Sequence, residues 1–200
     1  MRVQVRGAAA RALGLLSFVL VLVLSLPVGT PLAAGFEDIG KVGLAIKAGE
    51  CAGPMGAQAS WNLSGHWQLA TGVGGANPLA SVLERARFRT DSYYALGKYY
   101  FEHLYLAAGY TYWISKARVE SGGRFEEDEK SEHGLPIHLG YEFGKRKGFF
   151  FSTSIGYVFV PWGGGRTLEV ILPGARAINQ TPDSGPSVGA SVGYYFDAFK

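Results

Sequence analysis

Cysteine and long apolar segments are both scarce in this sequence. Its single cysteine, Cys51, leaves no partner for an intramolecular disulfide. After residue 35 no apolar run approaches the about 20 residues that a helix needs to cross a bilayer, and 3.6-residue periodicity is hard to find. The sequence therefore excludes a disulfide-stapled fold and a bundle of transmembrane helices.

An excess of charge is also missing once the first residues are set aside. The chain holds 19 Lys and Arg against 16 Asp and Glu, and three of the arginines are Arg2, Arg6 and Arg11. They precede an apolar run from Leu13 to Leu26, and small residues follow at 33–35. This pattern predicts a cleavable signal peptide over residues 1–34. Residues 35–200 are then close to neutral, which gives no ground for a nucleic-acid partner.

Two-residue alternation dominates residues 35–200 and predicts strands. Leu44 and Ile46, for example, alternate with Ala45 and Lys47. The same alternation predicts eight strands in all, at 42–48, 55–63, 67–73, 92–101, 104–113, 135–143, 149–160 and 187–196. Because strands of about 9 to 12 residues match the thickness of a bilayer, we expect an all-β fold, an eight-stranded antiparallel up-and-down transmembrane β-barrel. Closing the sheet satisfies every backbone amide without water.

The connections between these strands alternate in length. Those at 64–66, 102–103 and 144–148 are short, whereas 75–91, 115–134 and 161–185 are longer and polar. A transmembrane barrel has short periplasmic turns and longer outer loops. We therefore expect residues 116–134 to be a solvated loop. Residues 166–172 are expected to extend the two strands that flank the last loop. Aromatic residues gather near the strand ends and predict two interfacial girdles, marked by the tryptophans Trp61, Trp67, Trp113 and Trp162.

The segment 104–113, Leu-Tyr-Leu-Ala-Ala-Gly-Tyr-Thr-Tyr-Trp, resembles strands of the OmpA/OmpX-like family of small outer-membrane barrels. The alternating apolar residues that lead from Val188 to Phe196 are similar to the family's C-terminal assembly signal, although this chain adds residues 197–200. The resemblance implies an outer-membrane location and a role in envelope integrity, adhesion or defence. It identifies no ligand.

The predicted strand register places several polar side chains inside the barrel. They are Lys47, Lys98, His138 and Glu142, joined by Gln58, Asn62 and Gln68. A barrel of eight strands is just filled by its own side chains, so these groups are expected to satisfy one another. Lys98 and Glu142 lie at similar depth and are predicted to approach each other.

A catalytic alternative uses His138. The predicted hairpin puts His138 opposite Ser154, with Glu142 on the same face, which suggests a lipid A-modifying hydrolase. Against this, Glu142 is four residues along the strand, or about 13 Å, too far to orient the imidazole. No catalytic residue is therefore assigned.

Other candidate sites have ordinary explanations. The acidic run 126–129 lacks the fixed, convergent oxygens of a calcium site and is expected to be solvated. His66 and His103 fall in periplasmic turns, and no second His or Cys lies at metal-ligand spacing, so neither metal nor cofactor is predicted.

Three functions remain. The favoured one is a non-enzymatic outer-membrane barrel, surrounded by lipid and lipopolysaccharide, whose loops 116–134 and 161–185 contact a surface ligand or host factor. The second is the lipid A hydrolase. The third is a soluble exported binding barrel similar to lipocalins, which would not need detergent for extraction.

Overall fold

The structure is a computed structural model that describes residues 41–76, 86–121, 123–144, 146–162, 164–173 and 175–197. The predicted signal peptide, residues 1–34, lies outside the described residues. Among the described residues, no helix has the length and apolar character needed to cross a membrane.

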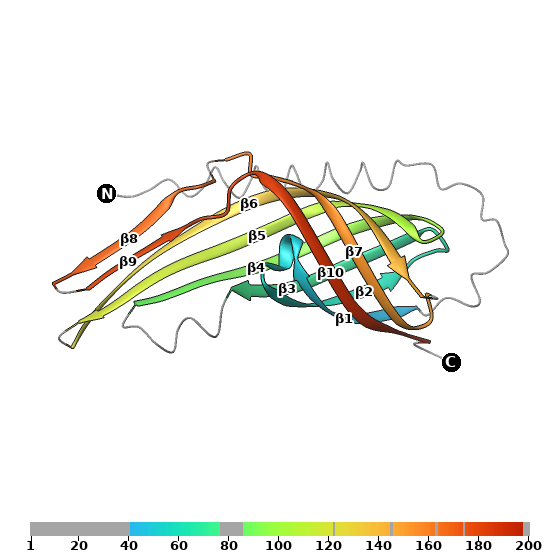
Figure 1. Ribbon diagram of the computed structural model, residues 1–200, viewed down its shortest axis with the longest axis horizontal. Coiled ribbons are helices and arrows are strands. Elements are labelled where there is room, and N and C mark those ends of the chain that lie inside the picture. Colours follow the sequence, from blue (N-terminus) through green and yellow to red (C-terminus); the bar gives the residue numbers. More distant parts are fainter. Residues whose placement is uncertain are drawn as a thin grey trace. The chain divides into compact units, whose positions relative to one another are not determined.

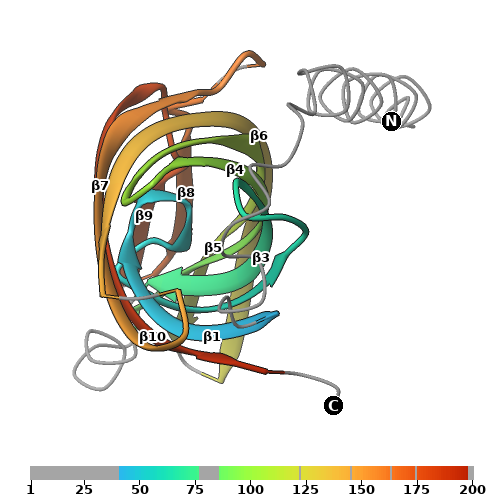
Figure 2. The ribbon, with the colours of Figure 1, turned by 90° about the vertical axis from the view of Figure 1, so that its right-hand side faces the viewer.

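Eight strands close into one antiparallel barrel (Figures 1 and 2). Around the barrel the order is β1-β10-β7-β6-β5-β4-β3-β2, and β1 pairs with β10 to complete the ring. This confirms the predicted fold class of an eight-stranded up-and-down barrel. The strands are β1 (Val42–Gly49), β2 (Met55–Asn62), β3 (Trp67–Ala76), β4 (Ala86–Phe101), β5 (Leu104–Ser121), β6 (Arg124–Phe143), β7 (Gly148–Phe159) and β10 (Gly185–Phe196).

The barrel wall is apolar on its outside, whereas its inside combines small, polar and aromatic side chains. Along β1, Leu44 and Ile46 are 54% and 61% exposed, whereas Ala45 and Lys47 are 8% and 4% exposed. Small inward residues make room for large ones: a Cβ on Gly140 would lie 2.2 Å from the ring of Tyr105. Because successive side chains of a strand point to opposite faces, the alternation in the sequence produces this division directly.

Short turns join the strands at one end of the barrel. In the turn after β2, the hydroxyl oxygen of Ser64 accepts hydrogen bonds from the backbone amides of His66 and Trp67. The two turn histidines also bind the wall, since His66 Nδ1 lies 3.0 Å from the carbonyl oxygen of Tyr100 and His103 Nδ1 lies 3.0 Å from that of Glu142. The side chains of Ser64, His66 and His103 therefore each have a backbone partner.

The segment 116–134 is not the solvated loop that the sequence predicts. β5 runs on to Ser121 and β6 begins at Arg124, so the two strands continue as a hairpin beyond the barrel. The charges that suggested solvation pair across this hairpin: Lys116 lies opposite Glu129, with Nζ and Oε2 2.6 Å apart. That hydrogen bond raises the pKa of Lys116 above its usual value. Opposite charges in register stabilise the strand pair instead of preventing it.

A second hairpin covers the first. Strands β8 (Thr167–Leu172) and β9 (Ala175–Gln180) form a separate two-stranded sheet, so residues 166–172 do not extend the flanking barrel strands as predicted. Its inner face packs on β5 in an apolar cluster of Ala117, Val119, Leu168, Val170 and Leu172. We call residues 116–121 and 124–132 together with β8 and β9 the appendage.

Two polar contacts fix the appendage further. Lys130 Nζ donates a hydrogen bond of 2.7 Å to the carbonyl oxygen of Thr167, and Arg166 Nε lies 3.6 Å from Oε1 of the buried Glu132. The appendage is consequently a small folded unit with its own core, built on the ends of two barrel strands.

Candidate functional site

A hydrogen-bonded polar network fills the turn end of the lumen. The carboxylate of Glu142 accepts hydrogen bonds from the hydroxyls of Tyr100, at 2.9 Å, and Tyr195, at 3.0 Å. Gln68 Nε2 donates in turn to Tyr195 and to Asn62 Oδ1. All of these side chains are at most 8% exposed, so the network is part of the barrel core.

Arg146 extends this network from the turn between β6 and β7. Its guanidinium lies 3.9 Å from the centre of the Tyr100 ring and donates to Asn62 Oδ1 and to the carbonyl oxygen of Gly65. A cation over an aromatic face is stabilised by the ring quadrupole, and more so away from water. The sequence placed Arg146 in an ordinary turn, and its role in the lumen was missed.

The structure places all four expected lumen residues inside the barrel. Lys47 is 4% exposed, Lys98 2%, His138 0% and Glu142 1%. Lys98 and Glu142 do not form an ion pair with each other. The Glu142 carboxylate accepts hydrogen bonds from Tyr100 and Tyr195 instead. The Lys98 ammonium lies 4.8 Å from the centre of the Tyr105 ring. The predicted pairing of these two charges is therefore replaced by separate aromatic partners.

The expected pairing of His138 with Ser154 is wrong by two residues. His138 lies opposite Gly156, and Ser154 lies opposite Gly140, because β7 starts at Gly148 after a turn that shifts the register. His138 Nε2 instead lies 2.6 Å from Oγ of Ser187 on β10. The three residues proposed for a hydrolase, His138, Ser154 and Glu142, are not assembled as a triad.

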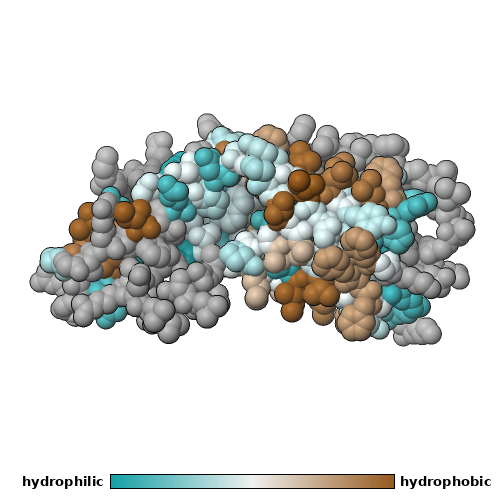
Figure 3. Space-filling view, in the orientation of Figure 1, coloured by the Kyte–Doolittle hydropathy of each residue, from teal (hydrophilic) through white to brown (hydrophobic). Residues whose placement is uncertain are grey.

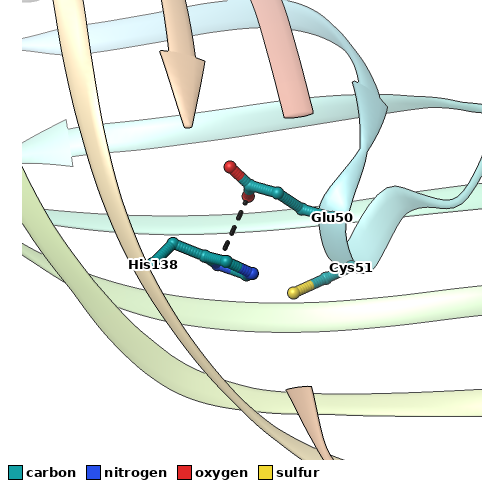
Figure 4. Close-up of side chains that lie close together, drawn as sticks. All are labelled: Glu50, Cys51 and His138. Atoms are coloured by element: carbon teal, nitrogen blue, oxygen red, sulfur yellow. Dashed lines mark ion pairs between the residues drawn. The ribbon is translucent and has the colours of Figure 1, made fainter. Parts of the chain in front are cut away.

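A short 3-10 helix occupies the middle of the lumen. η2 (Glu50–Ala52) connects β1 and β2 and folds inward, closed by a 2.6 Å hydrogen bond from the amide of Gly49 to the carbonyl of Gly53. Cys51 and Ala52 are fully buried against Ala70, Tyr94 and Leu96. Glu50 forms an ion pair with Lys47 and points toward His138 (Figure 4).

A cavity of about 280 Å³ lies next to η2. Glu50 and Ser187 line it together with the apolar side chains of Trp113, Val158 and Pro186. It is thus a partly apolar space that also holds the carboxylates of Glu50 and Asp183 and the hydroxyls of Thr90, Ser92 and Ser187.

The four tryptophans expected in the girdles differ in their surroundings. Trp61 and Trp162 are 41% and 43% exposed, and Trp67 packs edge-on against Tyr99, with ring centres 4.9 Å apart. Trp113 departs from the prediction: it is only 6% exposed and packs with Val158 and Val160. Odd-numbered residues of β5 face inward, and position 113 follows that alternation.

Neither a protein-family model nor a curated protein matches the sequence. Among solved structures, the chain is similar to CarO of Acinetobacter baumannii, with 12% identity and a TM-score of 0.44 over 79% of this chain and 98% of that one. The chain is similar to small outer-membrane β-barrels.

Two further structures show the same kind of similarity. Ail of Yersinia pestis, in complex with the heparin analogue sucrose octasulfate, has 16% identity and a TM-score of 0.45 over 78% of this chain and 95% of that one. Neisserial surface protein A has 13% identity and a TM-score of 0.43 over 78% of this chain and 94% of that one.

Proposed function

We propose that this chain is a non-enzymatic outer-membrane barrel, exported by the signal peptide of residues 1–34, that presents the appendage on the cell surface for contact with another protein. Lipid and lipopolysaccharide surround its wall. The observation that carries the proposal is an apolar outer belt on the barrel combined with a folded appendage beyond it.

The belt has the height of a bilayer core. On β7 the outward residues from Phe149 to Phe159 are apolar, aromatic or small, and this stretch covers ten residue steps. At about 3.4 Å per step and a tilt of about 45°, it rises roughly 24 Å, against the about 25 Å of an outer-membrane barrel. Figure 3 shows the apolar residues gathered on the barrel wall. They include Leu44, Ile46, Leu69, Val73, Leu106, Ile137, Leu139, Ile155, Val188 and Val192, each at least 43% exposed.

Strand length gives the orientation. β5 and β6 have 18 and 20 residues, whereas about 9 to 11 suffice to cross the hydrocarbon. The excess lies in the appendage, at the end opposite the short turns. Since short turns of outer-membrane barrels face the periplasm, the appendage faces outward.

The outer face of the β8–β9 sheet carries an exposed apolar patch. Ile171 is 61% and Ile178 45% exposed, and the register of the hairpin, with Glu169 opposite Ile178, puts both on one face. The opposite face is packed in the cluster with Ala117 and Val119, so the patch is held on a rigid support. Exposed apolar side chains on an ordered surface outside the bilayer are typical of a protein-binding surface.

The belt also distinguishes this proposal from its alternatives. A soluble lipocalin-like barrel would place polar side chains where Ile46 and Ile155 are 61% and 62% exposed. For a lipid A hydrolase, His138, Ser154 and Glu142 would have to act together. We expect mass spectrometry of lipid A to give the same acylation pattern with the wild-type chain and with all three residues changed to Ala.

An adhesion assay tests the surface role. Cells that express wild-type protein or the variant Ile171→Ser/Ile178→Ser are compared on serum-coated and uncoated polystyrene, at equal surface amounts. Each buried Ile contributes about 1.5–3 kcal/mol, so removing both should lower adhesion to the coated surface at least about tenfold. Glu126→Ser, at an exposed position of the same appendage, serves as the control and should adhere like wild type. Equal adhesion of the wild type and the double variant would contradict the proposal.

A further inference from the structure

Three side chains with metal-binding atoms meet inside the barrel. Glu50 and Cys51 come from η2 and His138 comes from β6, and their ligand atoms all lie within 4.8 Å of one another. Cys51 and His138 are 0% exposed, and the side chain of Glu50 is 2% exposed. Figure 4 shows Glu50 and Cys51 approaching the imidazole ring from η2.

One ring nitrogen of His138 has no hydrogen-bond partner. Nδ1 is buried without one in the described part of the chain, whereas Nε2 lies 2.6 Å from Ser187 Oγ. Glu50 Oε2 is 3.6 Å from Nδ1, which is too long for a hydrogen bond. When Nε2 donates its proton to Ser187, the Nδ1 lone pair is free to bind a cation beside the Glu50 carboxylate.

We propose that Glu50, Cys51 and His138 bind a divalent transition-metal ion, with Zn²⁺ as the best fit. Thiolate, imidazole and carboxylate are the ligands that zinc takes in proteins, whereas Mg²⁺ and Ca²⁺ prefer oxygen alone. Two such N and O ligands at about 2.0–2.1 Å from a tetrahedral ion stand about 3.3 Å apart. The observed 3.6 Å between Nδ1 and Oε2 needs only a small adjustment to reach this spacing.

The surroundings supply the other parts of such a site. Ser187 can accept the Nε2 proton and orient the ring with Nδ1 available, as second-layer hydrogen bonds do in metal sites. The cavity beside η2 is lined by Glu50 and gives the ion a path and room for a water ligand. Binding replaces the thiol proton of Cys51, which passes to solvent, and Lys47 keeps its ion pair with the Glu50 carboxylate.

The ion would fasten η2 to the barrel wall. Cys51 and Glu50 belong to the short segment between β1 and β2, while His138 belongs to β6. The backbone at Glu50 is left-handed, with φ of 49°, and the flanking Gly49 and Gly53 also have positive φ. This conformation directs the side chains of two successive residues toward the same ring.

A hydrolytic triad of Ser187, His138 and Glu50 uses two of the same residues. The missing hydrogen bond between Nδ1 and Glu50 argues against it, because a triad needs its acid to hold the imidazole. The two hypotheses differ in their dependence on Cys51 and Ser187, which makes them separable by experiment.

The test uses the full-length mature barrel without a histidine tag, folded in detergent and freed of metal with a chelator. Calorimetric titration with Zn²⁺ should give one ion per chain with a Kd on the order of 1 µM or tighter. Co²⁺ should produce a thiolate-to-cobalt charge-transfer band. Cys51→Ser should abolish that band and weaken Zn²⁺ binding at least about 100-fold, and Ser187→Ala should weaken it about 10- to 100-fold.

Ser191→Ala is the matched control, because Ser191 lies on β10 as Ser187 does but has its hydroxyl 2.7 Å from that of Ser152. It should bind Zn²⁺ like wild type. Heat-modifiable migration shows that each variant is folded, and Glu50→Gln replaces Cys51→Ser if the latter fails to fold. Undiminished Zn²⁺ affinity in a folded Cys51→Ser or Glu50→Gln variant, or no binding by wild type, overturns the proposal. Ester hydrolysis that is lost in Ser187→Ala and kept in Cys51→Ser also overturns it, in favour of the triad.

Discussion

The hydroxyl of Tyr195 on β10 donates a hydrogen bond to the carboxylate of Glu142 on β6, at 3.0 Å, although the residues are 53 positions apart in the sequence. The contact crosses β7 and links two strands that do not pair with each other. Buried polar groups in a low-dielectric interior destabilise a protein when they have no partners. The stability of the barrel therefore depends on the carboxylate of Glu142.

Removing that carboxylate should destabilise the barrel. Glu142→Leu removes the acceptor of the Tyr195 hydroxyl and leaves the Tyr100 hydroxyl only its longer, 3.3 Å contact with Gln68 Oε1. We therefore expect a loss of about 1–3 kcal/mol in the free energy of unfolding. Glu142→Gln keeps one acceptor oxygen and should lose less. Urea unfolding in detergent, followed by tryptophan fluorescence, measures both variants. An equal loss in the two would assign the effect to the charge and contradict the role given to these hydrogen bonds.

The same substitution should have different effects in the belt and in the appendage. Ile155, in the middle of β7, is 62% exposed, and Ile178, on β9, is 45% exposed. Ile155→Lys places a charge near the middle of the bilayer and should cost about 2–4 kcal/mol in lipid. Ile178→Lys faces water and should cost less than about 0.5 kcal/mol. Unfolding of the two variants in lipid vesicles checks this, and equal costs would mean that the belt does not contact lipid.

The appendage should loosen independently of the barrel. Leu168 is fully buried between β8 and β5 in the appendage core. Leu168→Asp puts a charge there without a partner, so we expect the β8–β9 hairpin to open and proteolysis to cut between residues 161 and 184. Thr167→Asp, at an exposed neighbouring position, is the control and should resist the protease. Loss of heat-modifiable migration in Leu168→Asp would show that appendage and barrel fold as one unit.

Much of the fold could be predicted from the sequence because a β-barrel repeats one simple rule, the alternation of inward and outward side chains. Alternation gave the strands, and the facing of Lys47, Lys98, His138 and Glu142 followed from it. The continuation of β5 and β6 was missed because a charged run reads as solvated when its partner strand is unknown. Only the register shows that Lys116 and Glu129 face each other.

The candidate metal cluster had no signal in sequence spacing. Cys51 and His138 are far apart in the chain, and they meet only because η2 folds into the lumen, where Cys51 and Ala52 find an apolar surface. Ser187 was missed for a similar reason: its contact with His138 crosses β7, which pairs with both strands. Cross-lumen contacts depend on the size and twist of the barrel, which strand patterns do not specify.

The accessibility of single cysteines in intact cells tests most directly whether the barrel spans the outer membrane with its appendage outside. In a Cys51→Ser background, Ile178→Cys lies in the appendage and Glu102→Cys lies in the short turn between β4 and β5, and both positions are exposed. A membrane-impermeant maleimide should label residue 178 in intact cells and residue 102 only after the outer membrane is permeabilised. Labelling of residue 102 in intact cells, or release of the protein by alkaline carbonate without detergent, would contradict a barrel that spans the outer membrane with its appendage outside.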